Sequence, residues 1–150
     1  MNIIFLCHGN ICRSPMAEFI MKELLREENP SGEYTITSAA VSYEEEGNPI
    51  YPPARAVLRH HSIPEGGHHA HRIQADEFRR ADLVIAMDHS NCRILKRILP
   101  GEDMGKVHML MEYTDEGGRN VADPWYTGDF ETCYRDIYKG CRGLLAALEG

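Results

Sequence analysis

The sequence predicts an α/β fold, with a four-stranded parallel sheet that carries helices on both of its faces. Strand-like and helix-like segments alternate along the chain, and each strand-like segment is a continuous apolar run. Such runs are typical of strands buried on both sides, and helices on each face of a parallel sheet provide that burial. The 150 residues have the length of one domain, so we expect a single domain over residues 1–150.

The first half of the chain begins with a predicted strand at residues 2–7, where the apolar run is short and partly β-branched. A helix is predicted at 15–28, because apolar residues recur there at spacings of three and four. Ser14 is the expected N-cap, and Pro15 suits the first helical position, where its missing N–H costs no hydrogen bond. A second strand is predicted at 34–38.

The second half repeats this alternation after a polar loop. Helices are predicted at 54–61, 74–81 and 90–99, with a closing helix at 130–148. Strands are predicted at 83–87 and 106–111, and a long Gly-rich loop at 115–129.

Composition excludes several classes of protein. Lys and Arg total 16 against 23 Asp and Glu, so the net charge of −7 disfavours a nucleic-acid partner. No apolar run reaches the roughly 18 residues of a membrane span, and the N-terminus lacks a secretory signal pattern. Five cysteines are an odd number, which argues against a disulfide framework. We therefore expect a soluble cytoplasmic protein that does not bind membranes.

The loop after the first strand is the expected place for chemistry, because ligands of parallel sheets sit beyond the carboxyl ends of the strands. A loop folded over a helix N-terminus directs backbone N–H groups inward and forms an anion cradle. Arg13 can bind two oxygens of a phosphate at once, and Gly9 gives the tight loop backbone freedom. The same positive field favours the thiolate of Cys7, which makes it a candidate nucleophile, and Ser14 can donate a hydrogen bond to its sulfur.

The alternative interpretation is structural: a buried cysteine at a strand end, an arginine in a surface ion pair and a serine N-cap. The predicted strand before the loop and the predicted helix after it favour the functional interpretation.

Residues 7–15 read Cys-His-Gly-Asn-Ile-Cys-Arg-Ser-Pro and resemble the signature of the low-molecular-weight protein tyrosine phosphatases. The resemblance continues at 38–42, at 86–91 and in the Asp-Pro-Trp-Tyr segment at 123–126, in the family's order. It implies metal-independent hydrolysis of phosphotyrosine in proteins or peptides, with inorganic phosphate as product and no cofactor.

The resemblance also implies residue roles. Cys7 attacks phosphorus to form a phosphocysteine, Arg13 binds the phosphate oxygens, and Asp123 serves as general acid and then as general base. The other residues implied to bind phosphate or substrate are His8, Gly9, Asn10, Ile11, Cys12, Ser14, Trp125 and Tyr126. Ser38 and His68 are implied to support the loop. In some relatives the neighbour that matches Cys12 forms a reversible disulfide with the nucleophile.

Substrate choice is expected to depend on the rim of the pocket. Related arginine phosphatases carry Thr at the position of Ile11, so Ile11 favours phosphotyrosine. Glu44 stands where many relatives carry a large aromatic residue, and the acidic run around it would repel acidic peptides. The loop at 47–53 looks more like bacterial than animal members.

One more departure from the family pattern and three alternative functions remain at this level. His71 occupies the position of a family arginine, which Arg72 would have to replace, and the histidines between 60 and 71 lack the cysteine or acidic partners of a metal site. An arsenate reductase would need two further cysteines that relay a disulfide, but only Cys92 follows the third strand and the next cysteine is Cys133, which disfavours this alternative. An arginine phosphatase is disfavoured by Ile11, and a non-catalytic phosphate-binding module is disfavoured by the presence of Arg13 and Asp123.

Overall fold

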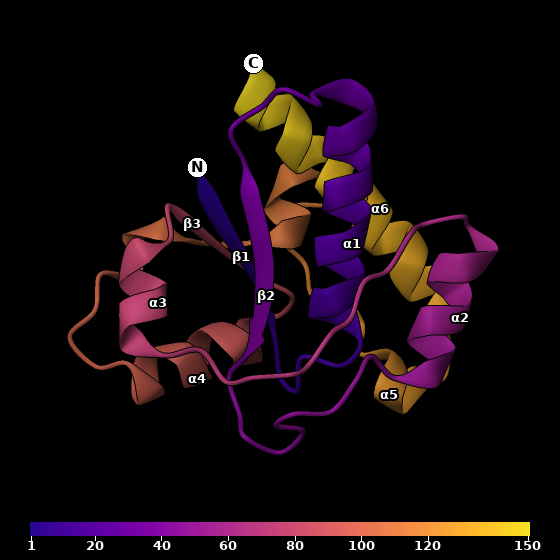
Figure 1. Ribbon diagram of the computed structural model, residues 1–150. Coiled ribbons are helices and arrows are strands. Elements are labelled where there is room, and N and C mark those ends of the chain that lie inside the picture. The colour runs from indigo at the N-terminus through magenta and orange to yellow at the C-terminus, as the bar shows by residue number, and fades with distance from the viewer.

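A computed structural model describes all 150 residues, and it contains a four-stranded parallel sheet with the strand order β2-β1-β3-β4 (Figure 1). The strands are β1 (Asn2–Cys7), β2 (Thr35–Ala40), β3 (Leu83–Ala86) and β4 (Val107–Met109). The α-helices are α1 (Arg13–Glu28), α2 (Pro52–His60), α3 (Ala75–Arg80), α4 (His89–Ile98), α5 (Pro124–Thr127) and α6 (Phe130–Glu149). Two 3₁₀ turns, η1 (Met104–Lys106) and η2 (Leu110–Tyr113), flank β4.

Side chains of β1 alternate between two hydrophobic cores, one on each face of the sheet. Ile3 and Phe5 belong to a core that they share with α1, α2 and α6. Ile4 and Leu6 belong to a second core with residues of α3 and α4. Figure 1 shows α1 and α6 on one side of the sheet and α3 and α4 on the other. The predicted parallel sheet with helices on both faces is therefore confirmed.

The fourth strand is shorter than the predicted 106–111. Strand β4 ends at Met109, because the chain turns into η2, where the Glu112 carboxylate accepts from the Met109 backbone N–H. Lys106 precedes the strand and donates from Nζ to the carbonyls of Phe78 (2.7 Å) and Ala81 (2.9 Å) at the end of α3. Each of these contacts joins residues 106–111 to a group outside that segment, and together they override its strand-like pattern.

Two further expectations need correction. Helix α1 begins at Arg13, Cys12 holds its N-cap position without a side-chain cap, and Ser14 lies inside the first turn. The loop predicted at 115–129 contains the short helix α5, which Asp123 caps by accepting from the Trp125 backbone N–H at 3.0 Å. The remaining elements lie where they were predicted, with ends shifted by at most two residues.

The position of β1 places the loop after Cys7 at the turning point of the topology. Strand β1 pairs with β2 on one side and with β3 on the other. The order in which successive strands are added to the sheet therefore changes direction at β1. Parallel sheets open a crevice beyond the carboxyl ends of strands at such a point. No helix in the structure combines the length and the apolar character that crossing a membrane requires.

The segment around His71 extends the sheet at the end of β2. The Ala40 N–H donates to the His71 carbonyl at 2.7 Å, and the Ile73 N–H donates to the Ala40 carbonyl at 2.8 Å. The His71 ring lies 2.7 Å from the Glu77 carboxylate of α3. That hydrogen bond raises the pKa of His71 above its usual value, although burial opposes the charge. His71 thus ties this segment to α3.

Replacing Gly143 of α6 by alanine is expected to destabilise the fold. An added Cβ would lie 1.9 Å from the Tyr113 carbonyl oxygen, so the helix and η2 must separate. Such overpacking costs about 1–3 kcal/mol, more than the ~1 kcal/mol that alanine gains over glycine in a helix. Urea unfolding measures the loss. Gly66→Ala is the control, because its added Cβ meets nothing within 4 Å. Equal stability of the two variants would contradict the prediction.

Replacing His71 by asparagine is expected to cost more stability in acid than in base. The folded-state pKa of His71 lies above the unfolded value of about 6.5, so the pair with Glu77 stabilises the fold below that pH. The contribution disappears as pH rises through the raised pKa. Urea unfolding at about pH 5.5 and about pH 8.5 tests the sign. His60→Asn, an exposed histidine without an ion pair, serves as control. A larger loss of folding stability at the higher pH would contradict the prediction.

Candidate active site

The Cys7 sulfur lies at the centre of a cradle formed by the loop after β1 and the first turn of α1. It accepts from the backbone N–H groups of Asn10 (3.3 Å) and Ser14 (3.4 Å), and the Ser14 hydroxyl lies 3.0 Å away. Three hydrogen-bond donors and the positive end of α1 therefore converge on one buried sulfur atom. This arrangement stabilises negative charge on Cys7 and on an anion bound above it.

Asn10 holds the loop in shape. Its backbone adopts the left-handed conformation, with φ of 61°, which asparagine tolerates better than most residues. Its carbonyl accepts from His68 Nε2 at 2.7 Å, and its side-chain Nδ2 donates to the hydroxyls of Ser14 (2.8 Å) and Ser38 (3.0 Å). Burial lowers the pKa of His68, which favours the neutral ring at this contact. The structure thus brings Ser38 and His68 to the loop, as the resemblance implied.

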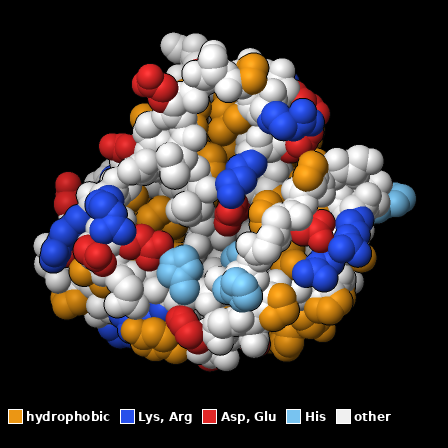
Figure 2. All heavy atoms as spheres, viewed as in Figure 1, with side chains coloured by type: hydrophobic (Ala, Val, Ile, Leu, Met, Phe, Trp, Pro, Cys, Tyr) orange, Lys and Arg blue, Asp and Glu red, His pale blue; other side chains and the backbone are white.

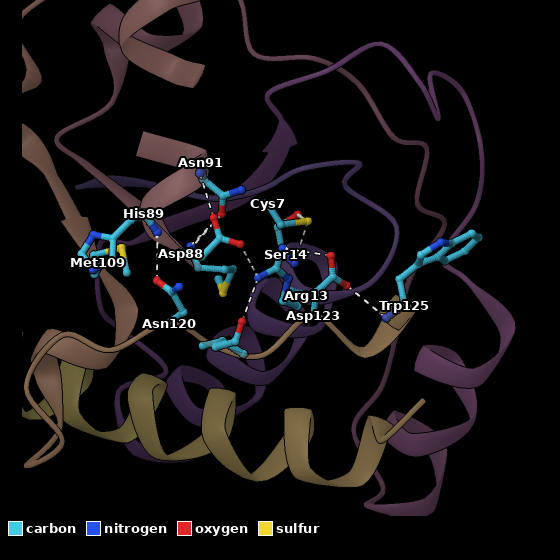
Figure 3. Close-up of polar contacts among 12 residues, drawn as sticks. Cys7, Arg13, Ser14, Asp88, His89, Asn91, Met109, Asn120, Asp123 and Trp125 are labelled. Atoms are coloured by element: carbon cyan, nitrogen blue, oxygen red, sulfur yellow. Dashed lines mark hydrogen bonds and ion pairs between the residues drawn. The ribbon is translucent and has the colours of Figure 1, made fainter. Parts of the chain in front are cut away.

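Arg13 is a buried cation held by three groups from two segments of the chain (Figure 3). Its Nη1 donates to the Asp88 carboxylate and to the Val121 carbonyl, both at 2.8 Å, and its Nη2 lies 3.4 Å from Asp123. Burial opposes the charge of the guanidinium, but the negative charges of Cys7, Asp123 and Asp88 raise its pKa. The group therefore stays charged and keeps one orientation.

Asp88 has no role in the motifs described above, and the structure adds it to the site. It caps α4 through an Oδ1 that accepts from the Asn91 backbone N–H at 2.8 Å, and its Oδ2 binds Arg13. The signal was available in the sequence, because an Asp directly after the third strand lies at the same sheet edge as the loop after the first. Its pairing with Arg13 could not be read from the sequence, because the two residues are 75 positions apart in the chain.

A cavity of about 540 Å³ opens above the cradle. Nine of the candidate residues line it: Cys7, His8, Gly9, Ile11, Cys12, Arg13, Asp123, Trp125 and Tyr126. The other four candidates, Asn10, Ser14, Ser38 and His68, lie behind the loop and connect to it through the Asn10 contacts. The structure thus gathers the residues that the sequence singled out into one place.

The aromatic side of the rim comes from α5. Trp125 is 53% exposed and Tyr126 is 85% exposed, and the Trp125 ring lies 4.9 Å from the ring of Tyr51. Figure 2 shows hydrophobic side chains gathered where α2 and α5 lie in Figure 1. Such an exposed apolar patch beside a polar cradle suits the binding of an aromatic group.

The acidic part of the rim comes from the loop after β2. Glu44 and Glu45 line the cavity, and the Glu44 carboxylate lies 3.1 Å from His8 Nε2. Neighbouring Tyr43 points elsewhere: its ring lies under the Arg72 guanidinium, 4.7 Å from the ring centre. The side chain of Arg72 thus packs on Tyr43, while the His71 backbone N–H donates to Asn10 Oδ1 at 3.2 Å.

All five cysteines are free thiols. Cys7 is only 3% exposed and Cys12 only 5%, and both line the cavity. Burial, the negative charge of Cys7 and that of Asp123 all raise the pKa of Cys12. Cys133 and Cys141 are buried on α6, and Cys92 on α4 is half-buried against Met109. No group of three or more His, Cys, Asp or Glu side chains is arranged to hold a metal ion.

Comparisons with known proteins agree with this geometry. The family model for low molecular weight phosphotyrosine protein phosphatase matches residues 2–150. The phosphatase YfkJ of Bacillus subtilis is 32% identical over 99% of this chain and 96% of its own length. The Sus scrofa low molecular weight phosphotyrosine protein phosphatase is 35% identical over 96% of this chain and 93% of its own.

Solved structures give the same result. The crystal structure of B. subtilis YfkJ matches with a TM-score of 0.94 over 99% of this chain and 94% of that chain, at 32% identity. The crystal structure of a Drosophila arginine phosphatase matches with a TM-score of 0.89 over 100% of this chain and 99% of that chain, at 27% identity. Sequence, fold and relatives agree: the chain belongs to the low molecular weight phosphotyrosine protein phosphatase family.

Proposed function

We propose that this protein is a tyrosine phosphatase that hydrolyses phosphotyrosine and small aryl phosphates through a phosphocysteine on Cys7. The observation that carries the proposal is the convergence of three hydrogen-bond donors on the Cys7 sulfur, with Arg13 and Asp123 at the same cavity. A nucleophilic thiol must stay reduced, so we assign the protein to the cytoplasm.

The first step transfers the phosphoryl group to sulfur. The Cys7 thiolate attacks phosphorus, the S–P bond forms, and the bond from phosphorus to the phenolic oxygen breaks. Asp123 donates its proton to that leaving oxygen. Arg13 and the backbone N–H groups of the loop stabilise the negative charge on the equatorial oxygens.

The second step releases inorganic phosphate. Asp123, now a carboxylate, accepts a proton from a water molecule as that water attacks phosphorus, and the S–P bond breaks to regenerate the thiolate. Ser14 assists the departure of sulfur through its hydroxyl. Thiolate, guanidinium and carboxyl group supply all the chemistry, so the proposed reaction requires no metal or cofactor.

The rim supports phosphotyrosine as the substrate class. Trp125 and Tyr126 offer aromatic surface to a phenyl ring, and Ile11 lines the cavity where related arginine phosphatases carry Thr. The likeness to the Drosophila arginine phosphatase shows that the fold alone does not decide between the two substrates. Glu44 and Glu45 disfavour acidic peptides near the phosphate.

Hydrolysis of p-nitrophenyl phosphate without added metal tests the reaction. Cys7→Ser is expected to abolish turnover, and Asp123→Ala to lower kcat by roughly 10²–10⁴, the range for loss of a general acid. Asp129→Ala is the matched control, because Asp129 also caps a helix but lies outside the cavity. Full activity of the Cys7→Ser protein would sink the proposal. Equal losses of kcat in the two aspartate variants would contradict the assignment of Asp123 as general acid.

A panel of phosphopeptides tests the substrate class. The protein is expected to release phosphate from phosphotyrosine faster than from phosphoserine or phosphoarginine. Ile11→Thr is expected to shift the kcat/KM ratio toward phosphoarginine by roughly tenfold, about the effect of one or two methyl-sized contacts in a pocket. Phosphoarginine hydrolysis that already exceeds phosphotyrosine hydrolysis in the unmodified protein would assign it to the other substrate class.

A further inference from the structure

Helix α4 forms a wall of the cavity that lies across from the aromatic rim. Figure 3 shows Asp88 and Asn91 on one side of Cys7 and Trp125 on the other. Figure 1 likewise shows α4 and α5 on opposite sides of the lower end of the sheet. A substrate bound at Cys7 therefore lies between two different walls. Four residues from the N-cap and the first turns of α4 line the cavity: Asp88, Ser90, Asn91 and Ile94.

Asp88 and Asn91 are already engaged within the protein. Asp88 Oδ2 accepts from Arg13 Nη1 at 2.8 Å. The buried Asn91 side chain accepts from the Asp88 backbone N–H at 3.2 Å and so holds the start of the helix. Ser90 and Ile94 lie one turn apart on the same face of α4, and they are the part of this wall that is left for a substrate.

Ile94 offers a fixed apolar surface beside the polar cradle. It is half-buried, because it packs against the hydrophobic core that contains Phe78 and Leu95 and also lines the cavity. A β-branched side chain on a helix has one strongly preferred χ1 rotamer, so Ile94 needs no ordering when a ligand arrives. An apolar surface that is already ordered loses little entropy on binding. This wall therefore suits an aliphatic group.

The position of Ile94 along α4 determines which part of a substrate it meets. Asp88, which binds Arg13, is the N-cap of the helix. At 1.5 Å per residue, Ile94 lies about 9 Å farther along the helix axis. A phosphate held by Arg13 is therefore out of reach of Ile94. Since the phenyl group extends from the phosphate toward the rim, the peptide chain around the tyrosine is the part that meets Ile94.

We infer that Ile94 is a specificity-determining residue of the proposed phosphatase, and that it binds an aliphatic side chain directly beside phosphotyrosine in the substrate. The inference rests on the proposed function and names the phosphotyrosine peptides that the site prefers. Glu44 and Glu45 on the acidic rim repel a carboxylate at the same cavity, which also favours an uncharged neighbour over an acidic one. None of the motifs that identify the family includes Ile94.

Phosphotyrosine peptides that differ only at the residue before or after phosphotyrosine test the inference. Alanine, leucine and lysine are compared at each of these two positions by measuring kcat/KM. Leucine is expected to exceed alanine by roughly tenfold at one of them, the lower end for a small apolar contact, because Ile94 is only half-buried. Equal values for leucine and alanine at both positions would overturn the inference. So would a preference for lysine over leucine, which would assign recognition to Glu44 and Glu45.

Ile94→Thr keeps the β-branch but removes apolar surface, so the leucine-to-alanine ratio of kcat/KM is expected to fall toward one. Ile98→Thr is the matched control, because Ile98 lies on the same helix and packs against the same core but does not line the cavity. The control is expected to keep the ratio of the unmodified protein. A general loss of activity cancels in this ratio, and p-nitrophenyl phosphate, which has no neighbouring residue, measures that loss separately. Equal ratios in the two variants would contradict the role of Ile94.

Ile94→Lys separates contact with the substrate from packing of the helix. A lysine at this position can pair with a carboxylate of the peptide. The preference for glutamate over leucine at the position found above is therefore expected to rise by roughly threefold, about the effect of one exposed ion pair. A variant that loses folding stability but keeps the peptide preference of the unmodified protein would overturn the inference, because Ile94 would then act through packing alone.

Failure of this inference and failure of the proposed function give different results. Hydrolysis of all the phosphotyrosine peptides at one rate would overturn the role of Ile94 and leave the proposed function standing. No hydrolysis of any peptide would overturn the proposed function. Binding of the same peptides to the Cys7→Ser protein, measured by fluorescence anisotropy, would then still decide the inference: tighter binding of a leucine peptide than of its alanine counterpart supports it, and equal binding overturns it.

Discussion

The buried charge of Arg13 is the constraint around which the site is assembled. A guanidinium that is 2% exposed must be paired, because an unpaired buried charge costs several kcal/mol. Its partners Asp88, Val121 and Asp123 follow β3 and precede α5, so one cation fixes the end of one strand and the start of a distant helix against the loop after β1. The arrangement of three segments thus follows from satisfying a single side chain.

The acidic composition makes this concentration of positive charge necessary. A chain with net charge −7 has no general attraction for a phosphate dianion. Attraction comes instead from the buried guanidinium and from N–H groups at the start of α1, which salt screens less than it screens surface charges. The carboxylates that hold Arg13 also reduce its net field, so the backbone donors around the Cys7 sulfur share the task of binding the anion.

Much of the fold could be predicted, because apolar runs and helical periodicity can be read from neighbouring residues. The apolar residues of these segments fill the two cores. Cys7, Arg13 and Asp123 could be singled out because each lies in a short motif of neighbouring residues. Asp88 was not assigned a role, since its partner Arg13 lies 75 residues away in the chain. Ser14 was mistaken for a helix cap, whereas its hydroxyl lies beside the Cys7 sulfur. Strand β4 was overextended because Lys106 binds carbonyls at the end of α3 and Glu112 binds the Met109 N–H where the strand ends.

Helix α5 has only four residues, and it carries Asp123 at its N-cap and Trp125 and Tyr126 within its single turn. One turn has almost no stability of its own, so its position is set by what packs against it. The aromatic surface of Trp125 and Tyr126 and the carboxyl group of Asp123 therefore belong to one short element. In the proposed reaction, the surface that meets the phenyl ring and the group that protonates its oxygen are placed by the same turn.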